Sequence, residues 1–492
     1  ARGGSAVDAA IAANAVLAVT EPMMCGLGGD LFVLYREAST GKLVGLNSSG
    51  WAPQTLSIPN LRERGHKTMP RIGILSATVP GTVEGWNKLH QRYGRLPWRD
   101  LFDAATAHAR DGFPVTEIIA SYWPNKILEP PFLPARRAGD VFKNPALAGA
   151  FEILADGGPD AFYRGAIAEA ILRTSQRLGG ALSAGDLRDF EAQWVDPVST
   201  TYRGWRVFEL PPNGQGMAAL EMLNILETFP APQSPDADDL HRKIEAMKLA
   251  YADLRRYNAD PRFGDVPVSG LISKAYAARR AVLIDAAQAN CTVSAGTPPA
   301  SSNDTTYLSV VDRDGNIASW IQSVSGVWGS GVLVDGMGFH LHNRGGGFSF
   351  DPAHPNALEP RKRPFHTIIP AYMEKDGQHI GFGIMGGSNQ PLAHAQFVSH
   401  IADFRLNLQA ALEAPRFTKR NTTGCDVQME RRIPPAVRQA LIKRGHKVDV
   451  RDAYSANMGR GEAVLHNSAT RVNFGASSPQ GDGAAIPEPV RR

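Results

Sequence analysis

The chain opens with a pattern of apolar and polar positions that predicts a helix, a glycine turn and a strand. Ser5 followed by Asp8 is typical of a helix N-cap, and the alanine-rich run Ala6–Val19 predicts a buried helix. The run CGLGGD at 25–30 predicts a tight turn at which backbones approach closely, and the apolar run 31–35 predicts a strand. This helix–glycine–strand order reverses that of dinucleotide sites, so it disfavours a nucleotide-dependent enzyme.

Helical spacing dominates the middle of the chain. Apolar residues recur every three to four positions, which predicts that residues 113–260 are largely helical, with helices over 166–178 and 218–229. The small, polar and proline-bearing stretch 286–304 interrupts this pattern. Such a stretch is typical of an exposed linker that is easily cut.

After the linker the pattern changes to strands. Two strand-like runs, 305–312 and 316–324, flank a turn at 313–315 and predict a β-hairpin. A three-residue loop places Thr305 opposite Ser323, whereas a two-residue loop would shift the pairing by one. Downstream, strands are predicted over 331–334, 367–373 and 380–385, and a helix over 392–403.

Composition indicates a turn-rich globular protein. The 492 residues are 43% hydrophobic and 20% charged, and 49 glycines and 35 prolines are spread along the chain. The net charge of +4 is scattered, and the basic groups 361–363 and 431–432 are too short for a nucleic-acid-binding stripe. No apolar run reaches the ~18 residues of a membrane span. Since Ala1 enters the fold directly, the absence of a signal peptide carries no conclusion about a periplasmic or cytoplasmic compartment.

Cysteine and histidine positions predict neither a disulfide framework nor a metal centre. Cys25, Cys291 and Cys425 are odd in number and widely spaced, which favours buried or incidental thiols. His340 and His342 alternate on a strand-like run, but two histidines without a third ligand are a weak metal signal. We expect no metal and no cofactor.

The run DTTYLSVVDRDGN at 304–316 resembles the start of the small subunit of γ-glutamyltranspeptidases. Further blocks occur in family order on both sides of the linker and cover almost the whole chain. Ordered blocks at matching spacing are far more specific than a single motif. The blocks are 3–10 (GGSAVDAA), 52–53 (AP), 79–83 (VPGTV), 109–113 (ARDGF), 160–165 (DAFYRG), 202–204 (YRG), 329–331 (GSG), Asn343, 348–349 (FS), 362–364 (KRP) and 386–388 (GGS).

The resemblance implies an α+β fold, the four-layer αββα sandwich of the N-terminal nucleophile hydrolases, and a precursor that cuts itself. By position the cut falls between Asp304 and Thr305, leaving a large fragment 1–304 and a small fragment 305–492 as a heterodimer in one globular unit. Thr305 is then the nucleophile. Its own α-amino group, with an unperturbed pKa of ~8, is the base that a weakly nucleophilic hydroxyl requires. Without the neighbouring blocks, Thr305 would be an ordinary strand threonine.

The resemblance also implies partners for Thr305. Ser323 stands where the family has a threonine hydroxyl beside the nucleophile, in agreement with the hairpin register. Gly386 and Gly387 match the oxyanion hole, in which two successive backbone N–H groups stabilise the developing negative charge. Ser325 replaces a family asparagine that helps to bind substrate, although an ordinary loop serine fits the sequence equally well.

Positions that hold the γ-glutamyl group in the family differ here. Ser49 stands at the position of the arginine that binds the α-carboxylate, while Arg344 and Gly347 replace the glutamine and the aspartate that bind the α-amino group. His366 and Thr367 replace two hydroxyl residues. Losing the acid leaves an ammonium group unpaired and disfavours γ-glutamyl substrates. Arg344 and His366 suit a substrate carboxylate instead, unless Arg344 faces solvent or pairs structurally.

The leading hypothesis is a self-processing N-terminal threonine amide hydrolase or acyltransferase of the γ-glutamyltransferase (glutathione hydrolase) family. It acts on a small carboxylate-bearing amide or peptide through an acyl-enzyme. The alternatives within the family are an oxamate-type amidohydrolase and a cephalosporin (glutaryl) acylase. A catalytically silent scaffold is the alternative from another class, and the retention of Thr305, Ser323, Gly386 and Gly387 counts against it.

Overall fold

Strands from the two sides of the linker pair within the same sheets. The computed structural model describes residues 2–123, 129–293 and 305–488. These fall into two units, the first from 1–195, 303–366 and 488–492, and the second from 196–302 and 367–487. Each unit therefore draws on chain from before and after the linker.

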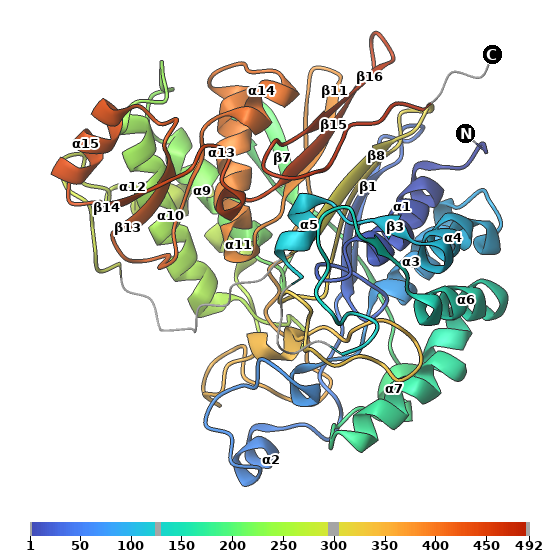
Figure 1. Cartoon of the computed structure of the whole chain (residues 1–492). Helices are drawn as coiled ribbons and strands as arrows, with labels where there is room; N and C mark the ends of the chain where they lie inside the picture. Colours follow the sequence, from blue (N-terminus) through green and yellow to red (C-terminus); the bar gives the residue numbers. More distant parts are fainter. Residues whose placement is uncertain (1, 124–128, 294–304, 489–492) are drawn as a thin grey trace. The chain divides into compact units, whose positions relative to one another are not determined.

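The first unit has a five-stranded antiparallel sheet in the order β5-β2-β1-β9-β8. Helix α1 packs on β8 and β9, and α3 packs on β1 and β2, so helices cover this sheet (Figure 1). Its strands are β1 (Asp30–Arg36), β2 (Leu43–Ser48), β5 (Gln193–Val195), β8 (Thr306–Val311) and β9 (Ile317–Ser323). Its longer helices are α1 (Ala6–Thr20), α3 (Thr82–Tyr93), α4 (Asp103–Asp111), α6 (Pro145–Tyr163) and α7 (Ala166–Arg177).

The hairpin β8–β9 has the predicted three-residue turn. Val311 pairs with Ile317, and the Asp312 amide donates to the Asn316 carbonyl over 3.1 Å. Continuing this register past β8 sets Thr305 opposite Ser323, so the predicted alignment is confirmed.

The predicted N-terminal helix and glycine turn are confirmed. Ser5 and Asp8 form a capping box at the start of α1, each side chain accepting from the other's backbone N–H. Gly29 sits where a Cβ atom would lie 2.5 Å from the Ser323 carbonyl oxygen, so only glycine allows β1 to start this close to β9.

The second unit has a six-stranded sheet in the order β16-β15-β11-β10-β7-β6. Helix α9 packs on β6 and β7 and α13 on β11, while α10 and α12 pack on α9. The strands are β6 (Val198–Tyr202), β7 (Trp205–Glu209), β10 (Ala371–Lys375), β11 (Gln378–Ile384), β15 (Gly461–Asn467) and β16 (Val472–Ser477). The helices are α9 (Gly216–Glu227), α10 (Ala237–Tyr257), α12 (Lys274–Ala281), α13 (Gln390–Ala402), α14 (Leu408–Glu413) and α15 (Pro435–Lys443). A smaller sheet contains β12 (Phe417–Thr418), β13 (Asp426–Glu430) and β14 (Lys447–Arg451).

Three secondary-structure predictions need correction. The stretch 113–260 contains strands β5, β6 and β7 as well as helices. The strand predicted over 367–373 begins only at Ala371, because Pro370 lacks the N–H that a ladder requires. The strand predicted over 331–334 is reduced to a single bridge between Leu333 and His340, in a segment interrupted by glycines with positive φ.

The prediction of three unpaired thiols is wrong. Cys291 and Cys425 form a disulfide bond across a sequence separation of 134 residues, while Cys25 is free and buried. The pairing is tertiary, since the ends of two distant segments meet in the second unit. Spacing in the sequence carries no signal for such a contact.

No helix among the described residues combines the length and the apolar character that crossing a bilayer requires.

Candidate active site

Thr305 and Ser323 meet at the open end of the β8–β9 hairpin. The Thr305 Oγ1 hydroxyl donates to Ser323 Oγ over 3.3 Å, and both residues are fully buried. Adjacent strands in register hold the two hydroxyls together, because directly opposed side chains lie on the same face of the sheet. The arrangement holds the hydroxyl of Thr305 beside a second hydroxyl in a water-poor environment.

Ser325 orients Ser323 through its backbone. The Ser325 N–H donates to Ser323 Oγ over 2.8 Å, and Ser325 itself has a φ of 79°. Non-glycine residues rarely adopt this left-handed conformation, and it recurs at functional sites. The hydrogen bond orients the Ser323 oxygen, so the backbone of Ser325 supports the pair of hydroxyls.

A buried carboxylate, Asp30, joins the predicted substrate-binding residues. Its Oδ2 atom lies 2.8 Å from His366 Nε2 and 3.6 Å from Arg344 Nε. His342 Nδ1 is also 3.6 Å away, and all four side chains are at most 1% exposed. A carboxylate only accepts hydrogen bonds, so His366 carries its proton on Nε2. Arg344 therefore does not face solvent. It does pair within the protein, because Asp30 is its counterion.

The ionisation of this cluster follows from burial and from its charges. Burial opposes the ionised form of Asp30, but His342, His366 and Arg344 outweigh it and lower the pKa of Asp30 to about 2. Burial, with the Arg344 charge, lowers the pKa of His366 to about 3. Burial also lowers the pKa of Arg344 to about 10, so its guanidinium stays charged. At neutral pH the cluster holds one anion, one cation and neutral His366.

Asp30 also contacts the residue after Ser49, the position at which the resemblance predicts the family's carboxylate-binding arginine. Its Oδ1 atom accepts from the Gly50 N–H over 2.9 Å. The preceding residue, Ser49, is fully buried and donates from its hydroxyl to Asn47 Oδ1 over 2.8 Å. The Ser49–Gly50 peptide and Arg344 thus contact the same carboxylate. A cation is present near this position, but it comes from a different segment of the chain.

The first unit therefore brings together Thr305, Ser323 and Ser325, and gathers Arg344 and His366 around Asp30. Asp30 joins the two groups, since it is the Cα partner of Ser323 across β1 and β9. Asp30 was not among the site residues predicted from the sequence. Its signal was an acidic residue entering an otherwise apolar strand directly after a glycine pair.

Gly386, Gly387 and Thr367 belong to the second unit. Gly386 has a φ of 137°, which side-chain-bearing residues rarely adopt, and Gly387 has a φ of 58°, in the left-handed region that favours glycine. Gln215 Nε2 donates to the Gly387 carbonyl over 2.8 Å and to the Thr367 carbonyl over 2.5 Å. The buried Gln215 amide thereby orients this turn, which leads directly into helix α13. The other predicted site residue, Asp304, lies outside the described residues.

Within the described residues, His241, Glu245 and His446 have ligand atoms within 4.8 Å of one another, which is a possible metal site. His241 and Glu245 are one turn apart on α10. However, the Lys248 ammonium lies 2.6 Å from Glu245 Oε1, and His241 Nδ1 is 2.8 Å from His446 Nε2. A cation and a hydrogen bond already satisfy these groups, so we assign no metal to them.

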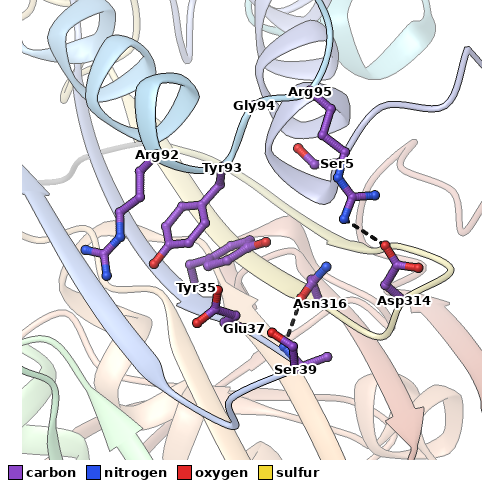
Figure 2. Close-up of a pocket in the computed structure, with 11 residues that line it drawn as sticks. Ser5, Tyr35, Glu37, Ser39, Arg92, Tyr93, Gly94, Arg95, Asp314 and Asn316 are labelled. Carbon is purple, nitrogen blue, oxygen red and sulfur yellow. Dashed lines mark hydrogen bonds and ion pairs between the residues drawn. The ribbon is translucent and has the colours of Figure 1, made fainter.

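A surface pocket of about 460 Å³ lies at the turn end of the hairpin, away from Thr305. Figure 2 shows Tyr35 and Tyr93 on one side of it and the Arg95–Asp314 ion pair on the other. Asp314 lies in the turn, so the length of β8, about 20 Å, separates it from Thr305. The pocket is therefore distinct from the Thr305 site.

Comparison with known proteins identifies relatives over the whole chain. A family profile described as Gamma-glutamyltranspeptidase matches residues 1–488. The "Glutathione hydrolase-like YwrD proenzyme" of Bacillus subtilis is 35% identical, with 99% of this chain and 94% of the relative covered. The "Oxamate amidohydrolase proenzyme" of Klebsiella pneumoniae is 34% identical, with 98% of this chain and 94% of the relative covered. The crystal structure of cephalosporin acylase from Bacillus halodurans matches with a TM-score of 0.91 at 40% identity, with 98% of this chain and 91% of that chain covered. This match confirms the predicted α+β fold class of the N-terminal nucleophile hydrolases.

Proposed function

Because the chain belongs to the gamma-glutamyltranspeptidase family, we propose that this enzyme is a self-processing N-terminal threonine amide hydrolase whose nucleophile is Thr305. The observation that carries the proposal is the buried hydrogen bond from Thr305 Oγ1 to Ser323 Oγ. The proenzyme names of the relatives support processing of the chain.

Processing begins at the bond before Thr305. The Thr305 hydroxyl attacks the Asp304 carbonyl carbon, and the C–N bond breaks as the acyl group moves from nitrogen to oxygen. Water then hydrolyses the ester, which leaves a carboxylate on Asp304 and a free α-amino group on Thr305. The products are fragments 1–304 and 305–492.

Turnover uses the new α-amino group as the base. It takes the proton of the Thr305 hydroxyl while the oxygen attacks the substrate amide, and the amine leaves with that proton. Water resolves the resulting acyl ester, or an acceptor amine does so in transfer. We propose Gly386 and Gly387 as the oxyanion donors, on the resemblance of the 386–388 (GGS) block to the family's oxyanion hole, and their positive φ angles are compatible with this role.

We propose that the buried cluster of Asp30, Arg344 and His366 selects an acyl group that carries a carboxylate and no α-amino group. Arg344 supplies a cation, and Asp30, which also accepts from the Gly50 N–H, is its counterion. His366 adds a neutral imidazole fixed by the same acid. Ser325 and, from the second unit, Thr367 are proposed as further substrate contacts on the resemblance alone. Oxamate and glutaryl amides fit this description, and the names of two relatives, an oxamate amidohydrolase and a cephalosporin acylase, support those substrate classes.

Substitution of Thr305 tests its proposed role as the nucleophile in processing and turnover. Thr305→Ala should leave one full-length chain on a reducing gel and abolish turnover, while Thr305→Ser should be processed. Thr306→Ala is the matched control, because Thr306 instead contacts Glu21 and lies outside the proposed chemistry. Normal processing of Thr305→Ala would refute the proposal.

A kinetic comparison tests the substrate class. Processed enzyme should give a higher kcat/KM with oxamate or a glutaryl amide than with glutathione. A glutathione kcat/KM that is larger by a wide margin would overturn the pocket assignment. It would favour the second candidate, a glutathione hydrolase, which the name of the YwrD relative supports.

A further inference from the structure

A disulfide bond joins the two sides of the proposed cut. Cys291 belongs to fragment 1–304 and Cys425 to fragment 305–492, with their Cα atoms 4.8 Å apart. We propose that this bond keeps the two fragments of the processed enzyme covalently joined. The inference rests on the proposed cut, and nothing in the mechanism above requires it.

The segment that carries Cys291 is bound by groups from both fragments. The Lys248 ammonium donates to the Asn290 carbonyl over 2.8 Å, which ties the segment to α10 of its own fragment. The Ala289 N–H donates to the Arg444 carbonyl over 2.7 Å, and that residue belongs to the other fragment. The disulfide therefore lies in an ordered junction between the fragments within the second unit.

The two bonded cysteine residues differ in exposure. Cys425 is 5% exposed, and its Sγ atom lies 3.8 Å from the Lys248 ammonium. The Lys447 N–H donates to the Cys425 carbonyl over 2.7 Å, which fixes this end at the start of β14. Cys291 is exposed. A small dithiol can therefore reach the bond from the Cys291 side and reduce it to two thiols while the dithiol becomes a cyclic disulfide.

The bond matters most when the sheets open. In the folded protein the fragments already interlock, since β1 pairs with β9 in one unit and β7 with β10 in the other. Unfolding breaks these pairs, and without a covalent link it would release two separate chains. The disulfide makes refolding a reaction within one molecule, with a high effective concentration of one fragment near the other. Thirteen residues, 292–304, separate Cys291 from the cut.

Gel electrophoresis of alkylated, processed protein tests the link. We expect one full-length band without reductant and two shorter bands with it. Cys291→Ser and Cys425→Ser should give two bands under both conditions, whereas Cys25→Ser, which removes the free buried thiol, should behave as wild type. Two wild-type bands without reductant would overturn the link and leave the proposed function intact. One full-length band with reductant would overturn the cut itself, and the link with it.

Thermal unfolding provides a second readout that does not depend on gels. The Tm of processed Cys291→Ser should rise by about 2–3 °C per hundredfold increase in protein concentration, because unfolding now separates two chains. The Tm of processed wild type and of Cys25→Ser should not change with concentration. Equal concentration dependence in wild type and Cys291→Ser would overturn the proposal.

Discussion

Asp30 lies directly opposite Ser323 in the antiparallel pair of β1 and β9. Asp30 holds Arg344 and His366, while Ser323 accepts from the Thr305 hydroxyl. The residues proposed to recognise substrate and those proposed to react with it are therefore anchored at one pair of facing positions. A shift in the register of β1 against β9 would disturb both groups together.

The first prediction concerns the buried charge on Asp30. Asp30→Asn keeps the acceptor for the Gly50 N–H but leaves the Arg344 cation buried without its counterion. We expect the free energy of unfolding to fall by about 3–5 kcal/mol in urea titrations. The double variant Asp30→Asn with Arg344→Met should recover most of that loss.

An exposed pair provides the control. Asp156 bonds to Arg99 with both side chains more than half exposed, so Asp156→Asn should cost less than about 1 kcal/mol. A similarly small cost for Asp30→Asn would show that Asp30 is not the counterion of Arg344.

The second prediction concerns the hydroxyl beside Thr305. Ser323→Ala removes the oxygen that accepts from Thr305 Oγ1 and from the Ser325 N–H. We expect processing and kcat to slow by about 10- to 100-fold, measured by gel time courses and steady-state kinetics. Ser319→Ala is the matched control, since Ser319 lies on the same strand but bonds to Tyr307. Equal effects of the two substitutions would indicate a packing role only.

The third prediction concerns the charge of Arg344. Arg344→Met should lower kcat/KM for oxamate or a glutaryl amide by about 10- to 100-fold, because a charge-assisted contact to the substrate carboxylate is lost. The loss should appear mainly in KM and should be small for a neutral amide substrate. Arg344→Lys should be intermediate, since it keeps the charge but loses the planar fork. An equal loss for charged and neutral substrates would contradict the assignment.

The fourth prediction concerns acid stability. Burial lowers the pKa values of His366, His394 and His400 to about 3, from 6.5. Between pH 6.5 and 3 the unfolded chain therefore binds protons at these histidines and the folded chain does not. The free energy of unfolding is highest above about pH 6.5 and falls as the pH drops towards 3. The slope is at most about 1.4 kcal/mol per pH unit for each histidine.

Urea titrations between pH 7 and pH 4 measure this slope. His400→Gln should flatten the profile by removing one titrating group. Below about pH 4, Asp30 takes up a proton in the unfolded chain before it does so in the folded protein, which adds a loss of the same sign. A free energy of unfolding that stays constant between pH 6.5 and 4.5 would contradict the prediction.

The sequence by itself determined the features that depend on local spacing. The Ser5–Asp8 capping box and the three-residue turn at 313–315 are encoded within a few residues, so their helix and their hairpin register could be predicted. The three-residue loop, one of the two lengths left open by the sequence, set Ser323 against Thr305. Ordered blocks along the chain were enough to indicate the family.

Only the tertiary structure decided which distant groups meet. Asp30, Arg344 and His366 come from three separate segments. The net charge of their cluster depends on which of these groups stay ionised once they are buried together. The Cys291–Cys425 bond spans 134 residues and follows from the packing of the second unit. Spacing in a sequence specifies contacts along one helix or hairpin, whereas counterions and disulfide partners are selected by the approach of elements that are remote in the chain.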